Sequence, residues 1–213
     1  MVKPPGTGLA YHARMANPLA AATYKLAAHL PRQLPPDTAR EVAFAGRSNA
    51  GKSTALNALC HQNRLAKTSK TPGRTQQLVY FEVQPERYLV DLPGYGYAKV
   101  PEDLRAHWQQ FINRYFETRQ SLAGLVVVMD VRHPLRDYDR QMLAYAISRQ
   151  LPAHCLLTKS DKLGRGEQSK TLAAVRKQLL ADFGDSVSVQ LFSGDSKIGV
   201  DQARGVVAGW LQL

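Results

Sequence analysis

The chain of 213 residues has only two cysteines, Cys60 and Cys155, and each lies within an apolar stretch. Their separation and their apolar neighbours predict two reduced core residues and argue against a disulfide framework or a cysteine-ligated metal. Reduced thiols are typical of the cytosol, so we expect a cytoplasmic protein.

Long hydrophobic runs are also lacking, since none approaches the roughly 20 apolar residues that span a bilayer. The N-terminal sequence MVKPPGTGLAYHARM has neither the apolar stretch nor the small-residue cleavage site of a secretory signal. We therefore expect no membrane partner. An organelle transit segment is the alternative for this leader, which carries arginine and has no acidic residue.

Acidic residues are scarce in the first part of the chain. Between residues 1 and 81 only Asp37 and Glu41 are acidic and eleven residues are basic, so this stretch carries +9 of the formal net charge of +11. Such asymmetry favours a polyanionic partner, and an RNA or DNA backbone is the usual one. A solvated basic surface that only maintains solubility is the alternative.

What the sequence does contain is a regular alternation of short apolar runs with helical patterns after Asp37. Buried strands are expected at 41–46, 87–93, 125–130, 154–161 and 186–192, and one more at 76–83 forms a hairpin with 87–93. Helices are expected at 52–62, 102–119, 138–150, 167–183 and 199–213, with one extra helix at 17–30.

This alternation predicts an α/β fold with a six-stranded, mostly parallel sheet that helices cover on both faces. The length suits one such domain. We expect it to occupy residues 39–213, after an N-terminal extension of residues 1–38 that carries the short helix.

The sequence GRSNAGKST (46–54) connects the expected strand 41–46 to the helix that follows. Gly46 and Gly51 frame a turn whose backbone N–H groups can converge on phosphate oxygens, and side chains there would crowd the approach. Lys52 can contact the β- and γ-phosphates, and the Ser53 hydroxyl can bind Mg²⁺. A chance glycine-rich turn is the alternative, but phosphate binding requires this strand–loop–helix context.

Two further motifs each end an apolar strand. In DLPG (91–94), Asp91 can reach Mg²⁺ through water, and the Gly94 N–H can meet the γ-phosphate. In TKSD (158–161), the Asp161 carboxylate can accept two hydrogen bonds from guanine, which adenine cannot donate, while the stem of Lys159 lies along the base. Alone, TKSD favours a helix cap at Asp161. Together, and in this order, the three motifs favour guanine.

These elements together resemble a Ras-like P-loop GTPase, and more closely the EngB (YihA/YsxC) family of bacterial GTPases in the TrmE-Era-EngA-EngB-septin-like class. The resemblance runs from about residue 20 to the C-terminus. It is carried by the sequences PPDTAREVAFAGRSNAGKSTALNAL, TSKTPGRTQ, YLVDLPGYGYAKVP, VVVMDVRHPL and LLTKSDKL.

The resemblance implies roles for two more segments. Thr75 is similar to the switch threonine that closes over Mg²⁺ and the γ-phosphate, and FSGDSK (192–197) to the last guanine loop, with backbone N–H groups around Ser193 and Gly194 facing the base. The chain departs from the commoner pattern at Gly194, which has no side chain. Thr158 replaces the usual asparagine, so we expect a side-chain tie between loops to be lost, although the EngB family tolerates threonine there.

The expected site residues can now be given in full. Those expected to be catalytic are Lys52, Thr75, Gly94 and Asn49, and those expected to hold Mg²⁺ are Ser53, Thr75 and, through water, Asp91. The expected GTP-binding residues are Gly46, Arg47, Ser48, Asn49, Ala50, Gly51, Lys52, Ser53, Thr54, Gly73, Arg74, Thr75, Gln76, Gln77, Asp91, Leu92, Pro93, Gly94, Thr158, Lys159, Ser160, Asp161, Phe192, Ser193 and Gly194.

Two residues bear on how GTP would be hydrolysed. Ras-type enzymes orient the attacking water with a glutamine where this chain has Tyr95, so intrinsic hydrolysis should be slow. Similarity to GTPases with GxxNxGKS loops implies that Asn49 helps hold a K⁺ ion and that K⁺ speeds turnover. The alternative is that Asn49 only braces the loop.

The family resemblance implies a monomeric, GTP-gated assembly factor that binds the large ribosomal subunit and its rRNA and that is needed for normal cell division and septation. Ordering of the first switch by GTP would place Arg64, Lys67, Lys70 and Arg74 beside an RNA surface. A second cationic group follows the strand at 125–130 and comprises Arg132, His133, Arg136 and Arg140. His133 there is typical of a loop or capping residue.

Two other functions are weighed against this one. The runner-up is a GTPase switch that acts mainly on a protein partner in cell division. The third is a nucleoside-phosphate kinase or ATPase that shares only the phosphate loop, and the TKSD motif argues against it.

Overall fold

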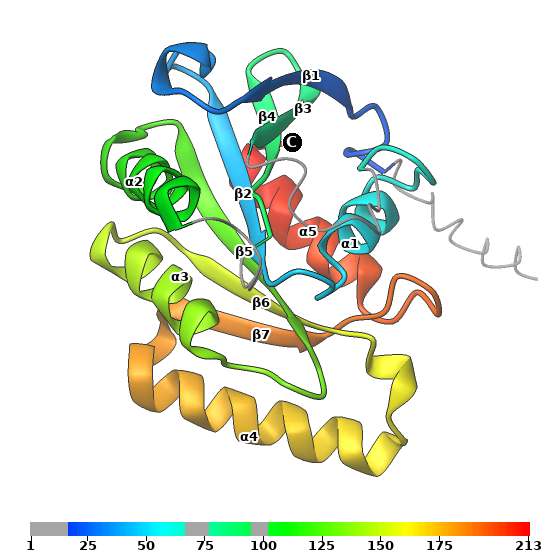
Figure 1. Ribbon diagram of the computed structural model, residues 1–213. Coiled ribbons are helices and arrows are strands. Elements are labelled where there is room, and N and C mark those ends of the chain that lie inside the picture. Colours follow the sequence, from blue (N-terminus) through cyan, green and yellow to red (C-terminus); the bar gives the residue numbers. More distant parts are fainter. Residues whose placement is uncertain (1–16, 67–76, 95–101) are drawn as a thin grey trace, which may run out of the picture.

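The computed structural model describes residues 17–66, 77–94 and 102–213, in which one sheet is covered by helices on both faces (Figure 1). The strands lie in the order β1-β3-β4-β2-β5-β6-β7. Their bounds are β1 (Thr23–Ala28), β2 (Arg40–Gly46), β3 (Leu78–Gln84), β4 (Arg87–Asp91), β5 (Leu122–Asp130), β6 (Ala153–Thr158) and β7 (Val187–Leu191). Among them only β3 runs against the others, because β1–β3 and β3–β4 are antiparallel and the other pairs parallel.

Five α-helices and three short 3₁₀ turns connect these strands within the described residues. The helices are α1 (Lys52–Leu59), α2 (Glu102–Thr118), α3 (Asp137–Ser148), α4 (Arg165–Phe183) and α5 (Val200–Leu211), and the turns are η1 (Pro31–Gln33), η2 (Ser160–Lys162) and η3 (Gly184–Ser186). The expected doubly covered, mostly parallel fold is therefore confirmed, with one strand more than the six expected.

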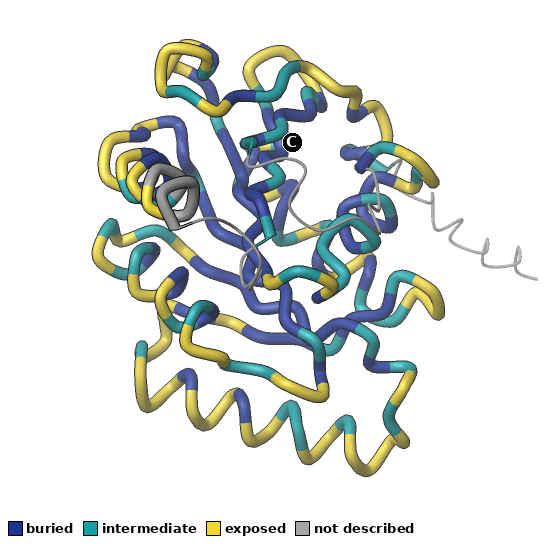
Figure 2. Tube along the Cα trace, in the orientation of Figure 1, coloured by how far each residue is buried: buried dark blue, intermediate teal, exposed yellow. Residues whose placement is uncertain are grey.

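The core has two layers, one on each face of the sheet. Helices α1 and α5 pack on one face, and α2, α3 and α4 pack on the other. Neighbouring residues of β2 alternate between the layers: Ala43 and Ala45 face α2 and α3, whereas Val42 and Phe44 face α1 and α5. Figure 2 shows the central strands buried along their length, as expected for a parallel sheet covered on both sides.

The helix expected at 17–30 is wrong. Residues 17–22 form a turn, and β1 then pairs with the edge of β3, with a bulge between Tyr24 and Leu26. The alanine-rich sequence favours a helix locally. Pairing with β3 satisfies the backbone N–H and C=O groups that an edge strand would otherwise expose, and Leu26 packs against the core.

Chain segments 78–84 and 87–91 form the expected β3–β4 hairpin. Its turn is made by Pro85 and Glu86, and Glu86 takes a left-handed backbone with φ 61°. The hairpin prediction is therefore confirmed.

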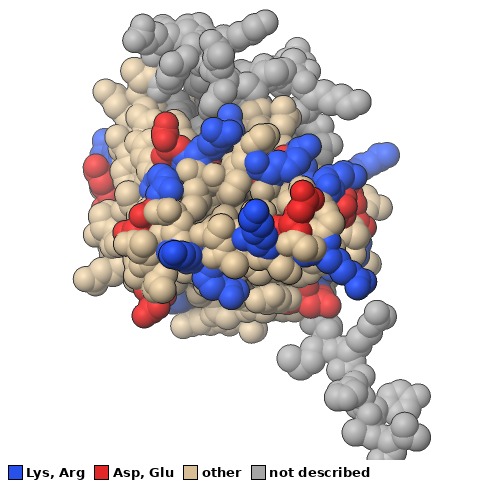
Figure 3. All heavy atoms as spheres, turned by 90° about the horizontal axis from the view of Figure 1, so that it is seen from below, with Lys and Arg blue, Asp and Glu red and all other residues tan. Residues whose placement is uncertain are grey.

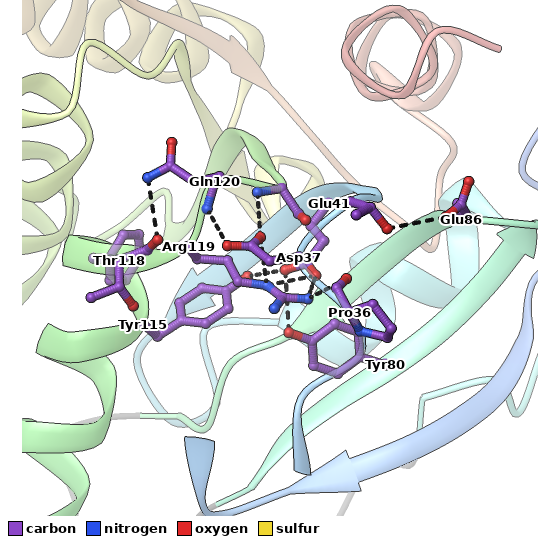
Figure 4. A network of polar contacts seen from close by, with 12 residues as sticks. Pro36, Asp37, Glu41, Tyr80, Glu86, Tyr115, Thr118, Arg119 and Gln120 are labelled. Atoms are coloured by element: carbon purple, nitrogen blue, oxygen red, sulfur yellow. Dashed lines mark hydrogen bonds and ion pairs between the residues drawn. The ribbon is translucent and has the colours of Figure 1, made fainter. Parts of the chain in front are cut away.

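A buried polar cluster joins β2, β3 and α2 (Figure 4). The Glu41 carboxylate is fully buried and forms an ion pair with Arg119, just after α2, whose Nε donates to it at 3.0 Å. The hydroxyls of Tyr80 and Tyr115 donate to the other carboxylate oxygen at 3.2 and 2.9 Å. Burial raises the pKa of both tyrosines, so they stay protonated and act as donors.

The two cysteines are free and buried on opposite faces of the sheet, as expected. Burial raises the pKa of Cys60 to about 12 and that of Cys155 further still, so neither thiol ionises near neutral pH. Within the described ranges, no helix is both long and apolar enough to cross a membrane.

Candidate nucleotide-binding site

Four segments meet at one edge of the sheet: the phosphate loop, DLPG, TKSD and the loop 192–197. They do so because they follow the carboxyl ends of the parallel strands β2, β4, β6 and β7. One hydrogen bond and one close approach join the DLPG motif to the strand and loop beside it. The Leu92 N–H donates to Phe44 O at 3.0 Å, and a Cβ at Gly94 would lie 3.4 Å from the Ser48 Cα. The DLPG motif and the phosphate loop, which are separated in the sequence, therefore lie side by side at this rim of loops.

The phosphate loop has the backbone that anion binding requires. Asn49 and Gly51 both take left-handed conformations, with φ 62° and 94°, and the Ala50 N–H closes the turn on Arg47 O at 3.0 Å. Alternation of left- and right-handed residues points successive N–H groups into one concavity. Helix α1 begins at Lys52 directly behind it, so its first free N–H groups face the same space.

The sequence did not reveal why position 46 must be glycine. A Cβ at this position would lie 2.7 Å from the carbonyl oxygen of Val128, so the close packing of β2 on β5 excludes any side chain. Gly51, by contrast, is needed for its positive φ. The first glycine of the motif thus serves the sheet and the second serves the loop.

Lys52 and Asp91, the two charged residues expected at the phosphates, form an ion pair, and both side chains are largely buried. The described residues contain no group of three or more histidine, cysteine or acidic side chains that could hold a metal by itself. The Ser53 hydroxyl and the Asp91 carboxylate therefore fit Mg²⁺ only as partial ligands of an ion that phosphate oxygens also bind, which is how Mg²⁺ is usually held.

Ser48 adds an unpartnered polar group at this place. Its Oγ is buried and has no hydrogen-bond partner among the residues that the structure describes. A buried hydroxyl without a partner costs free energy, so a polar ligand beside the phosphate loop would relieve that cost.

Asp161 lies where it could read a base, and it does not cap a helix. Its Oδ1 accepts a hydrogen bond from Ser193 Oγ at 2.6 Å, and Lys162 lies 3.1 Å from the other oxygen. The hydrogen bond from Ser193, helped by Lys162, lowers the pKa of Asp161, so its carboxylate is ionised and remains an acceptor.

The expectation that Thr158 loses the tie between loops is wrong. Thr158 is buried, and its Oγ1 lies within hydrogen-bond distance of Ala50 O in the phosphate loop and, at 2.9 Å, of Met129 O in β5. A hydroxyl has one hydrogen and donates to one of these carbonyls at a time. When it donates to Ala50 O, the Thr158 hydroxyl ties the TKSD motif to the phosphate loop.

Lys159 reinforces the same junction. Its Nζ donates to Asn49 O at 2.7 Å and to the Asp130 carboxylate at 3.0 Å. Asp130 ends β5 and was missing from the expected site, although its position at the end of the apolar run VVVM was a usable signal. Hydrogen bonds from Arg132, and further ones from Lys159, hold the pKa of Asp130 well below its usual range.

The last loop is anchored differently from the expectation. The Ser193 N–H donates to Ile198 O at 2.9 Å, which leaves the Gly194 N–H as the backbone donor to consider for a base. A Cβ at Gly194 would lie 2.7 Å from the Thr54 methyl group, so the missing side chain lets this loop approach α1. Ser160 Oγ ties the loop to TKSD by donating to Phe192 O at 3.0 Å.

Several expected residues fall outside the described ranges: Lys67, Lys70, Gly73, Arg74, Thr75, Gln76 and Tyr95. Of their neighbours, Arg64 is exposed, Gln77 is half-buried just before β3, and Leu92 and Pro93 are buried.

Comparison with known proteins identifies the family. Residues 41–159 match the family described as 50S ribosome-binding GTPase. The chain is 70% identical over 192 residues to the probable GTP-binding protein EngB of Xanthomonas axonopodis pv. citri (strain 306), an alignment that covers 90% of each chain. It is also 70% identical to that of Stenotrophomonas maltophilia (strain K279a), covering 90% of this chain and 96% of the relative.

Solved structures agree on the fold. A crystal structure of a probable GTP-binding protein engB superposes with a TM-score of 0.64 at 17% identity, over 81% of this chain and 98% of that one. Era in complex with MgGDPNP and nucleotides 1506–1542 of 16S ribosomal RNA superposes with a TM-score of 0.61 at 18% identity, over 81% and 56%. The fold, the four motifs joined at one edge of the sheet, and these sequence matches show that the chain belongs to the EngB family of GTP-binding proteins and is a GTPase.

Proposed function

We propose that this GTPase acts as a GTP-gated assembly factor for the large ribosomal subunit, contacting its rRNA, and that cells need it for normal division and septation. The printed description of the matching family, 50S ribosome-binding GTPase, is the observation that carries this proposal. Era, which has the same fold, binds a guanine nucleotide and rRNA together. The formal net charge of +11 agrees with an RNA partner.

In this proposal, the phosphates, the base and the switch are assigned to different loops of the site. Residues of the phosphate loop, from Gly46 to Thr54, and of DLPG hold the phosphates with Mg²⁺, which neutralises the charge that develops during hydrolysis. Residues of TKSD and of 192–194 hold guanine, and Gly73, Arg74, Thr75, Gln76 and Gln77 complete the first switch. Residues 39–213 form the main part of the GTP-binding domain of a cytoplasmic monomer, and β1 of the N-terminal extension adds a strand to its sheet.

Nucleotide-dependent pelleting with ribosomal particles tests the main proposal. The purified protein should pellet with large subunits in the presence of a non-hydrolysable GTP analogue, less so with GDP, and less at high salt. Binding that ignores the nucleotide, or no binding, would contradict the assembly role. It would favour the alternative, a GTPase switch acting on a protein partner in cell division.

Guanine reading is tested separately by Asp161→Asn. The amide offers a donor where the carboxylate accepted, so affinity should move from GDP to xanthosine diphosphate, whose edge carries a carbonyl there. A site built to pair with a polar group rejects a ligand that lacks the matching group by about 10⁴-fold. Most of the preference for GDP over xanthosine diphosphate should therefore be lost. The matched control is Asp195→Asn, in the exposed part of the same loop. Unchanged GDP preference in Asp161→Asn would contradict the assignment.

A role of K⁺ at Asn49 is tested by turnover in K⁺ and Na⁺ salts. Because Asn49 has a positive φ, alanine would strain the loop, and Asn49→Gly is the cleaner variant. If the side chain helps hold K⁺, the wild type turns over faster in K⁺ and Asn49→Gly loses that advantage. Equal wild-type rates in both salts would show that Asn49 only braces the loop.

A further inference from the structure

A basic pocket lies beside the phosphate loop, on the side of the loop that follows β5. It is an open hollow of about 790 Å³ between Arg47 and the start of α3. Its lining residues are Arg47, Arg132, His133, Pro134, Leu135, Arg136, Asp137 and Tyr138. Arg47 reaches it from the phosphate loop, so one residue belongs to both places.

The charge of this basic pocket selects its ligand. Arg47, Arg132 and Arg136 are exposed, and among the lining residues that the structure describes Asp137 is the one acidic residue. Among the ion pairs of the described residues, none involves Arg47 or Arg136. Small-molecule sites are usually apolar with few polar groups. A lining rich in guanidinium groups suits phosphate, which their planar fork contacts with two hydrogen bonds.

We propose that this basic pocket binds a backbone phosphate of RNA. The inference rests on the proposed function, since it names the surface by which the protein would meet rRNA. The three arginines line an open hollow, so a polynucleotide can run past it and place one phosphate among them, and the net charge of +11 favours a polyanion over a small ion.

Asp130 connects the pocket to the nucleotide loops. Its carboxylate accepts from Arg132 Nε at 2.9 Å and Nη2 at 2.7 Å, and from Lys159 Nζ at 3.0 Å. Lys159 in turn donates to Asn49 O in the phosphate loop. A phosphate that draws Arg132 away changes the partners of Asp130, and hence of Lys159. Any such coupling must act equally in both directions.

A second basic surface provides the matched control. Figure 3 shows lysine and arginine side chains gathered on the face of the molecule along which α4 lies, with fewer acidic ones. Helix α4 contributes the exposed residues Lys170, Arg176 and Lys177. If RNA binding were only a matter of total positive charge, charges on α4 would matter as much as charges in the pocket.

The test measures affinity for a fluorescein-labelled RNA hairpin by fluorescence anisotropy, with the full chain and a non-hydrolysable GTP analogue. The pocket variant R132Q/R136Q and the control K170Q/K177Q each remove two positive charges. The pocket variant should bind about tenfold more weakly, and the slope of log affinity against log salt should fall by about 0.7 to 0.9, because the loss of one phosphate contact removes about that much. The control should stay near the wild type.

A second pair keeps the test independent of the Arg132–Asp130 contact. Arg136→Glu and Lys177→Glu each reverse one exposed charge, and only the former should weaken RNA binding. Circular dichroism and GDP affinity show whether each variant is folded.

Each other outcome overturns a definite statement. If the wild type binds RNA and the α4 variants lose as much affinity as the pocket variants, the pocket inference fails while the proposed function stands. If the pocket variants lose calorimetric binding of inorganic phosphate but keep RNA affinity, the pocket serves a small phosphate ligand and the RNA assignment fails. If the wild type binds RNA neither with the GTP analogue nor with GDP, the proposed function itself fails.

Discussion

Thr158 connects two loops of the site with a single hydroxyl group. The larger amide that GTPases commonly carry at this position has given way to a shorter side chain, yet Oγ1 still lies within hydrogen-bond distance of Ala50 O. The residue is 3% exposed, so water cannot replace the bond if it is lost. At this scale the site depends on individual donors and on individual missing Cβ atoms, such as that of Gly46.

Replacement of Thr158 by valine should therefore destabilise the protein, and replacement by serine, which keeps the hydroxyl, should destabilise it less. Valine has the same shape and lacks the hydroxyl, so a buried carbonyl loses its donor at a cost of about 1–3 kcal/mol. The free energy of unfolding in urea and the affinity for GDP should both fall in Thr158→Val. Equal losses in Thr158→Ser would mean that the methyl group, through packing, matters more than the tie.

Strands β6 and β7 are joined by a buried side-chain network in addition to their backbone ladder. His154 Nε2 donates to the amide oxygen Gln190 Oε1 at 2.9 Å, and Nδ1 lies 2.7 Å from Ser188 Oγ. Burial lowers the pKa of His154, which favours the neutral ring, and in that ring Nδ1 is the acceptor. Gln190 Nε2 passes the connection to Gly199 O, just before α5, at 2.7 Å. One imidazole thus links two strands to the start of a helix.

Stability should therefore decline as the pH falls below about 6.5, the ordinary pKa of histidine. Burial lowers the pKa of His154 in the folded protein, so below 6.5 the unfolded chain takes up the proton more readily. The loss is complete once the pH passes the folded pKa. Urea unfolding at pH 7.5 and 5.5 measures it.

The matched variants are His154→Gln and His29→Gln, the second at an exposed site. The first should flatten the pH dependence in this range and the second should leave it unchanged. Carboxylates with a lowered pKa, such as Asp37 and Asp161, lose their contribution only below about pH 4, so they do not interfere. An equal slope in His154→Gln would contradict the assignment.

Helix α2 is joined to the sheet by the buried Glu41–Arg119 pair, and we expect its rupture to be costly. Arg119→Met leaves the buried Glu41 carboxylate with the two tyrosine hydroxyls alone, and loss of one partner of such a pair costs about 3–5 kcal/mol. The double variant Glu41→Gln/Arg119→Met should recover part of this stability in urea unfolding. A double variant at least as unstable as the single one would show that no unpaired charge had been left behind.

The whole molecule brings loops from four strands to one rim, so a nucleotide should stabilise the complete fold. At a GDP concentration of about 100 Kd with Mg²⁺, the free energy of unfolding should rise by about 2.7 kcal/mol. Thermal unfolding should shift upward with GDP, shift less when EDTA removes Mg²⁺, and stay unchanged with ATP. An equal shift with ATP would revive the kinase or ATPase hypothesis.

Local patterns in the sequence were sufficient wherever the physics is local. The period of apolar residues placed the five helices and six of the strands within a few residues, and the hairpin at Pro85–Glu86 followed from its turn. The strand–loop–helix order around Gly51 and Lys52 predicted the turn of the phosphate loop and the start of α1, whereas its left-handed backbone is known only from the structure. Backbone conformation and amphipathicity are properties of neighbouring residues, so the sequence alone contains them.

Tertiary structure alone decided what depends on residues far apart in the chain. Residues 23–28 became a strand because β3 offered an open edge, which no local helix propensity can foresee. Gly46 is excluded from carrying a side chain by Val128, and Thr158 reaches Ala50 across 108 positions. The basic pocket likewise forms only when folding brings Arg47 to the loop after β5. Contacts of this kind depend on three-dimensional proximity, which the order of residues does not display.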